Sequence, residues 1–69
     1  MKPGDLVATY KSEWFIIDKG ERWVTLPEDD TLIVLDARYH LRAVHPIHGP
    51  GHFPGINPEY KARVINAAG

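Results

Sequence analysis

The chain has 69 residues, with eight Lys or Arg, nine Asp or Glu and a formal net charge of −1 when its four histidines are neutral. This length admits one small domain and excludes a multidomain enzyme. Cysteine is absent, which excludes disulfides, thiolate metal sites and thiol catalysis. No apolar stretch reaches the length of a membrane span or of a signal-peptide core, so we expect a soluble protein without a membrane partner.

Up to residue 45, alternating or β-branched runs are separated by turn signals, which is the pattern of a β meander. Strands are predicted over residues 5–11, 14–18, 23–26, 31–35 and 39–45. Asp18-Lys19-Gly20 predicts a tight hairpin, and Pro27-Glu28-Asp29-Asp30 predicts a turn with solvated carboxylates. Because closure removes unpaired edges, these strands predict a mainly β fold, a small five-stranded barrel.

The same period of two predicts which side chains are buried. The expected core consists of Leu6, Phe15, Ile17, Val24, Leu26, Leu32, Val34 and Leu41. With Phe15 and Ile17 pointing inward, Trp14 and Trp23 fall on the opposite face of the hairpin. Two outward tryptophans need a cover, which either the tail of the same chain or another chain supplies.

The opening Lys2-Pro3-Gly4-Asp5-Leu6-Val7, followed by Trp14-Phe15-Ile16-Ile17, a hairpin and Leu32-Ile33-Val34-Leu35, resembles the SH3-like barrels. That group includes KOW-type domains and many small bacteriophage proteins, and the resemblance covers residues 2–45. It implies an SH3-like barrel in a small virion or accessory protein of a phage, located in the virion or in the host cytoplasm. SH3-like barrels serve many unrelated functions, so the resemblance assigns no site.

The tail has a different character, because seven of the 13 residues from 46 to 58 are Gly or Pro. Proline disrupts helices and sheets and favours extended backbone, so we predict an extended arm with a domain boundary after residue 45. Asn57-Pro58-Glu59 fits a helix start and predicts a short terminal helix over Glu59–Ala68. Alternation of Tyr60, Ala62 and Val64 leaves a strand open as the alternative.

Four histidines lie at positions 40, 45, 48 and 52. Neutral imidazole is a common transition-metal ligand, so His45, His48 and His52 are weak candidates for a metal site. We favour solvated or interface histidines, because the prolines between them hold the segment extended. No nucleophile elbow or phosphate-binding loop is present, so we expect no catalytic residue, no cofactor and no enzymatic activity.

The favoured function is a non-enzymatic assembly module that latches onto a protein partner or onto further copies of itself through its C-terminal arm. The expected partner-binding residues are Trp14, Trp23, Ile47, Phe53, Ile56, Tyr60 and Val64.

The first alternative is a nucleic-acid-binding barrel of KOW type. It would use Trp14, Trp23 and Tyr39 for stacking beside Lys11, Arg22, Arg38 and Arg42. Charge disfavours it, because residues 1–45 hold six basic and eight acidic side chains. A histidine-loop metal protein is the second alternative.

Overall fold

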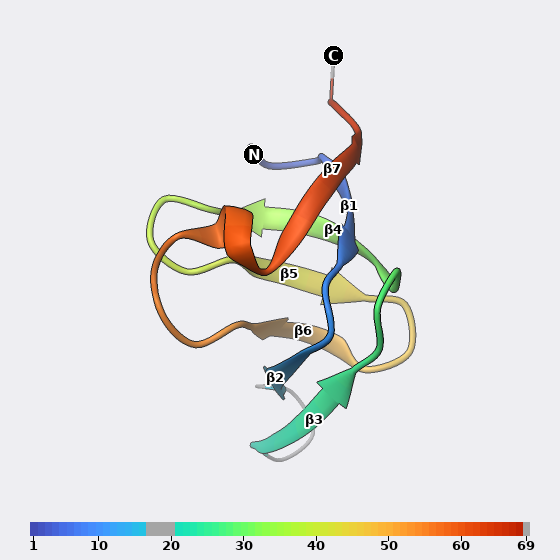
Figure 1. The fold of residues 1–69 in the computed structure, drawn as a ribbon, viewed down its shortest axis with the longest axis vertical. Coiled ribbons are helices and arrows are strands. Elements are labelled where there is room, and N and C mark those ends of the chain that lie inside the picture. Colours follow the sequence, from blue (N-terminus) through green and yellow to red (C-terminus); the bar gives the residue numbers. More distant parts are fainter. Residues whose placement is uncertain (17–20, 69) are drawn as a thin grey trace.

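The computed structural model describes residues 1–16 and 21–68. It contains a single antiparallel sheet with the strand order β3-β2-β6-β5-β4-β1-β7 (Figure 1). The strands are β1 (Leu6–Thr9), β2 (Ser12–Ile16), β3 (Arg22–Leu26), β4 (Thr31–Asp36), β5 (Arg42–His45), β6 (Gly49–His52) and β7 (Ala62–Asn66). A 3-10 turn, η1 (Pro58–Tyr60), precedes β7. The mainly β prediction and the five strands expected before residue 45 are confirmed.

The first four strands form one long hairpin that is bent in the middle. β2 pairs with β3 and β1 pairs with β4, both antiparallel. At the bend, the backbone N–H of Asp29 donates to the carbonyl of Thr9 at 2.7 Å, and Asp29 has a positive φ of 67°. The predicted turn at Pro27–Asp30 therefore exists. The predicted turn at Asp18–Gly20 lies outside the described residues.

The Lys2-Pro3-Gly4-Asp5 opening is a β-turn that ties the two chain ends together. The N–H of Asp5 donates to the carbonyl of Lys2 at 3.1 Å, and Gly4 supplies the φ of +88° that follows proline in a type II turn. The buried Asp5 carboxylate accepts the N–H of Ala68 at 2.7 Å and that of Lys2 at 2.9 Å. These bonds lower the pKa of Asp5, with the Ala68 bond as the largest cause. Figure 1 shows both ends on the same side of the molecule.

All the strands except β6 contribute to one core, which means that the sheet curves around it. The buried apolar side chains are Val7, Trp14, Leu26, Leu32, Val34, Leu41, Ala43, Phe53 and Ala62. Leu26, Leu32, Val34 and Leu41 confirm the prediction, and Val24 packs against this cluster. Phe15 and Ile17 cannot be scored, because their side chains lie outside the described residues.

The predicted strand phase is wrong in β1 and β2. Trp14 is fully buried instead of facing outward, and Val7 takes the core position expected for the half-buried Leu6. Trp14 pairs with Val24, so the two side chains share the inner face of the β2–β3 hairpin. Both segments carry apolar residues at consecutive positions, and a slip of one residue exchanges the two faces of a strand.

The predicted extended arm is wrong, because residues 49–52 form β6 inside the sheet. β6 pairs with β5 along its whole length and with β2 at His52 and Gly51. Pro50 pairs with Val44 of β5, and within the described residues β2 pairs with Gly51 and His52, which follow it. Residues 46–68 thus add β6 and β7 to the sheet and do not form an arm that extends away from it.

The predicted terminal helix is also wrong, and the strand alternative is correct. β7 pairs with β1 from Thr9 with Ala62 to Leu6 with Asn66, with an irregular step between Leu6 and Val7. Only the Pro58–Tyr60 turn remains of the helix start, and Asn57 before it has a positive φ of 66° without a side-chain cap bond. The free side of β1 offers backbone partners that an isolated short helix cannot find in water.

Candidate interaction surface

A row of apolar side chains crosses the outer face of four neighbouring strands. The register of the sheet pairs Leu6 with Ile33, Ile33 with Val44, and Val44 with Pro50. Residues paired in this way lie side by side on the same face of a sheet. Ile33 is 48% exposed, and Leu35, two residues further along β4, is 44% exposed. We call Leu6, Ile33, Val44 and Pro50 the outer apolar row.

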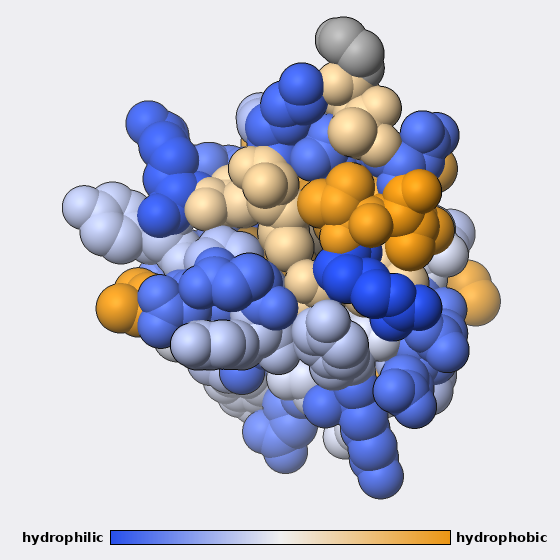
Figure 2. Space-filling view, turned by 45° about the horizontal axis from the view of Figure 1, so that its top comes forward, coloured by the Kyte–Doolittle hydropathy of each residue, from blue (hydrophilic) through white to orange (hydrophobic). Residues whose placement is uncertain are grey.

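The row ends at Leu6 in β1, whose partner on the edge strand β7 is the polar Asn66. Ile65 lies at the irregular step opposite Leu6 and Val7 and is 51% exposed. Val64 lies beside a groove of about 300 Å³ lined by Met1, Tyr10, Ala37, Pro58, Glu59, Ala62, Arg63 and Val64. Figure 2 shows a continuous orange and tan apolar area over this end of the molecule, bordered by hydrophilic side chains. β7 therefore presents aliphatic side chains next to an edge that, among the described strands, has no neighbour.

The structure scatters the partner-binding residues predicted from the sequence. Trp14 and Phe53 are completely buried, so they cannot form a contact surface. Ile47 and Ile56 are exposed in separate loops, and Trp23 is exposed on β3, the opposite edge of the sheet. Tyr60 is exposed in η1, and Val64 is exposed in β7. Of the predicted residues, only Val64 belongs to the surface described above.

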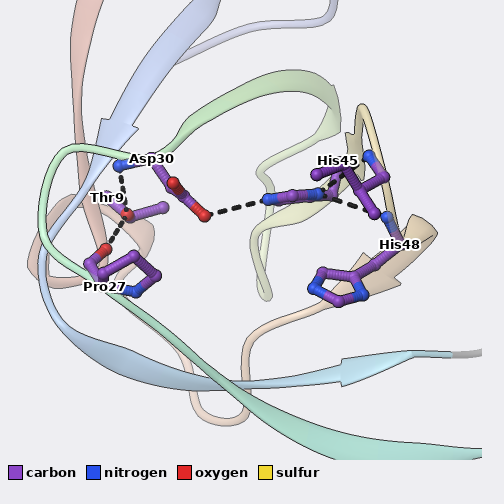
Figure 3. A network of polar contacts seen from close by, with 6 residues as sticks. Thr9, Pro27, Asp30, His45 and His48 are labelled. Atoms are coloured by element: carbon purple, nitrogen blue, oxygen red, sulfur yellow. Dashed lines mark hydrogen bonds and ion pairs between the residues drawn. The ribbon is translucent and has the colours of Figure 1, made fainter.

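A partly buried polar network connects the turn at Pro27–Asp30 with the turn that follows His45 (Figure 3). The Thr9 hydroxyl donates to the carbonyl of Pro27 at 2.7 Å and accepts the N–H of Asp30 at 3.1 Å. The Asp30 carboxylate lies 2.9 Å from Nε2 of His45, and Nδ1 of His45 accepts the N–H groups of Ile47 and His48. Since Nδ1 is an acceptor, the proton of neutral His45 is on Nε2, which donates to Asp30. The prediction that all the turn carboxylates are solvated is wrong for Asp30.

The four histidines form two pairs and do not converge on one point. The ring centres of His45 and His48 are 4.7 Å apart against Trp14, whereas those of His40 and His52 are 5.8 Å apart at the other end of the β5–β6 hairpin. His45, His48 and His52 are thus not brought together. No group of three or more His, Cys, Asp or Glu side chains suited to a metal occurs within residues 1–16 and 21–68.

The structure divides the side chains proposed for nucleic-acid binding: Arg38, Tyr39 and Arg42 line one groove, whereas Arg22 and Trp23 lie on the edge strand β3. Trp14 is buried and cannot stack on a base, whereas Trp23 and Tyr39 are exposed. Arg38 forms an ion pair with Asp36 at 3.3 Å, which lowers the pKa of that carboxyl. Arg42 pairs with His52 across β5 and β6. The pKa of His52 is lowered first by burial and then by the nearby positive charges of His40 and Arg42.

Sequence reasoning missed the outer apolar row because it assigned Leu6 to the core and left Ile33, Leu35 and Val44 unassigned. The signal was present in Thr31–Asp36, where Leu32 and Val34 are buried while Ile33 and Leu35 are exposed. This apolar strand therefore has one covered face and one open face. An open apolar face on so small a domain indicates a contact surface.

Comparisons with protein-family models, with curated proteins and with solved structures found no match for this chain. Within the described residues, no helix has the length and apolar character needed to cross a membrane.

Proposed function

We propose that this chain is a non-enzymatic assembly module that associates with a second copy of itself through the edge of β7. The observation that carries the proposal is the coincidence of a strand edge that has no neighbour among the described strands with exposed aliphatic side chains at Val64 and Ile65. An exposed, flat edge strand with apolar side chains is a template for pairing with another chain. Backbone hydrogen bonds supply the affinity, and the flanking side chains supply the specificity.

The sequence of β7 suits antiparallel pairing with itself. A register centred on Val64 places Arg63 opposite Ile65 and Ala62 opposite Asn66, so no two like charges face one another. Such a contact is self-complementary, as a two-fold dimer requires. It also joins the outer faces of the two copies, so that the apolar rows approach each other across the new strand pair.

The basic side chain of β7 is neutralised within its own chain. The Arg63 guanidinium lies 2.7 Å from the Asp29 carboxylate, and this contact raises the pKa of Arg63. A lysine or arginine on an edge strand ordinarily opposes pairing through charge repulsion and desolvation. The ion pair with Asp29 reduces that barrier at β7.

The test is the oligomeric state of two lysine variants, measured by analytical ultracentrifugation across micromolar concentrations. Ile65→Lys places a charge on the β7 edge and is expected to weaken self-association about tenfold or more, since one buried charge costs more than a full decade of affinity. Ile47→Lys makes the same change in the β5–β6 turn, where the side chain is 85% exposed, and should leave association unchanged. A wild-type protein that stays monomeric, or equal weakening by both variants, contradicts the proposal.

We also propose a biological context for this module. The resemblance of residues 2–45 to SH3-like barrels supports a small phage virion or accessory protein, in which repeated contacts between copies are needed. Co-purification of the chain with an assembled particle is the measurement that addresses that setting.

A further inference from the structure

Beyond assembly, a second surface carries a different chemistry at the open end of the β5–β6 hairpin. His40 and Arg42 flank the fully buried Leu41, so both side chains point away from the core. Arg42 pairs with His52 in the register of β5 and β6, and the rings of His40 and His52 are 5.8 Å apart. The side chains of His40, Arg42 and His52 thus form one patch. Along β5, Arg42 lies two residues before Val44 of the outer apolar row.

We infer that Arg42, His40 and His52 form a binding site for the phosphate group of a phosphate ester. A guanidinium offers parallel N–H donors that match two oxygens of a phosphate. Beside it is a groove of about 350 Å³ lined by Asp36, Arg38, Tyr39, His40 and Arg42. This groove leaves room for the organic part of the ester next to the exposed Tyr39 ring.

The hydrogen bond of His40 determines when that ring can act as a donor. Nδ1 of His40 lies 2.8 Å from the carbonyl oxygen of Gly55, which can only accept, so Nδ1 carries a proton. In the neutral ring, Nε2 has no proton and repels an anion. Protonation turns Nε2 into a donor without disturbing the bond to Gly55, so His40 binds an oxyanion only in its charged form.

The charges around the patch favour an anion at low pH. Asp36 is the acidic residue of the groove, and its ion pair with Arg38 largely cancels both charges. Arg42 then supplies the net positive charge. Burial, and after it the nearby positive charges of His40 and Arg42, lower the pKa of His52, so a proton on this ring is disfavoured while no anion is bound. A bound dianion relieves this repulsion, so binding and protonation favour each other.

The experiment is an NMR titration of the full chain with sodium sulfate at constant ionic strength, at pH 5.5 and at pH 7.5. Sulfate is the probe because it mimics phosphate and keeps its charge over this range, so that a pH effect comes from the protein. We expect shifts confined to residues 36–42 and 52 and tighter binding at pH 5.5. Arg42→Gln should weaken binding about tenfold or more, as expected for a lost charge-assisted contact.

Arg22→Gln is the matched control, because it removes the same charge from an exposed position on β3. Equal weakening by both variants, unchanged binding by Arg42→Gln, or the same affinity at both pH values overturns the site. Phenyl phosphate and a single-stranded oligonucleotide, compared at equal phosphate concentration, then identify the source of the group. A small ester is indicated by similar affinities, and a nucleic-acid backbone by a preference for the oligonucleotide that falls steeply with salt. Either result supports the site only if Arg42→Gln weakens the binding of that ligand.

Discussion

The two histidine pairs at opposite ends of the β5–β6 hairpin show how differently one residue type is used in a small sheet. His45 and His48 lie against the buried Trp14, and both ring nitrogens of His45 have hydrogen-bond partners inside the fold. His40 and His52 lie at the outer surface beside Arg42, where burial is partial and positive charges are close. The first pair holds two turns together, whereas the second lies at the surface beside the Arg42 guanidinium. The two pairs differ because one packs against the buried Trp14 of β2 and the other lies near the surface.

The largest effect is expected from replacing Trp14, which lies against His45 and His48. Trp14→Ala should destabilise the fold by about 3–5 kcal/mol, since it removes a fully buried aromatic ring from a thin core. Trp23→Ala, at a half-exposed position, should cost about 1 kcal/mol or less. Urea unfolding followed by circular dichroism measures both. Equal losses of unfolding free energy in the two variants would contradict the core role assigned to Trp14.

Trp14→Phe is the companion variant, because it keeps an aromatic ring in the core. The indole Nε1–H of Trp14 is buried and has no hydrogen-bond partner within the described residues. Phenylalanine removes that unsatisfied donor, so its cost should be clearly smaller than that of alanine. A loss as large as that of Trp14→Ala contradicts this account.

The second test compares one histidine from each pair. His45→Ala leaves the Asp30 carboxylate and two backbone N–H groups without their partner, which should cost about 1–3 kcal/mol. His52→Ala should change the free energy of unfolding by about 0.5 kcal/mol or less, as expected near the surface. Chemical denaturation at pH 7.5 keeps protonation effects small. The contrast fails if His52→Ala is the more damaging change.

The third test uses pH. Burial, His40 and Arg42 lower the pKa of His52 below its ordinary value of 6.5, so the unfolded chain binds this proton more readily than the folded chain. The contribution of His52 to stability is therefore complete above pH 6.5 and is lost as pH falls through the lower folded value. His52→Gln should flatten this part of the stability profile between pH 7.5 and pH 5.

Arg42→Gln should raise the pKa of His52 toward its ordinary value, because one repelling charge is gone. Imidazole proton shifts in an NMR titration report that pKa directly. An unchanged titration curve in Arg42→Gln would show that Arg42 does not act on this ring.

The smallest expected effect is that of zinc. Each pair offers two imidazoles, and within the described residues no third ligand joins either of them. Structural zinc sites normally need four protein ligands, so micromolar zinc should leave the melting temperature unchanged. A zinc-dependent rise that disappears in His48→Gln or in His52→Gln would restore the metal-binding alternative and identify the pair responsible.

The sequence alone predicted what depends on neighbours along the chain. Alternation and turn signals located β1 to β5. The aliphatic core positions of β4 were also readable, because Leu32 and Val34 stand two residues apart in a clear strand. The histidine cluster was visible, but its division into two pairs was not.

Tertiary structure decided the rest, because the deciding partners are far away in the sequence. Gly49–His52 has almost no intrinsic strand preference, and it becomes β6 because β5 and β2 supply hydrogen-bond partners on its two sides. Ala62–Asn66 fits both a helix and a strand period, and the free side of β1 selects the strand. The choice between Trp14 and its neighbours as the buried residue depends on one residue of register, which local periodicity cannot fix when both faces of a strand are apolar. The outer apolar row and the patch of Arg42, His40 and His52 exist only once these pairings place distant residues side by side.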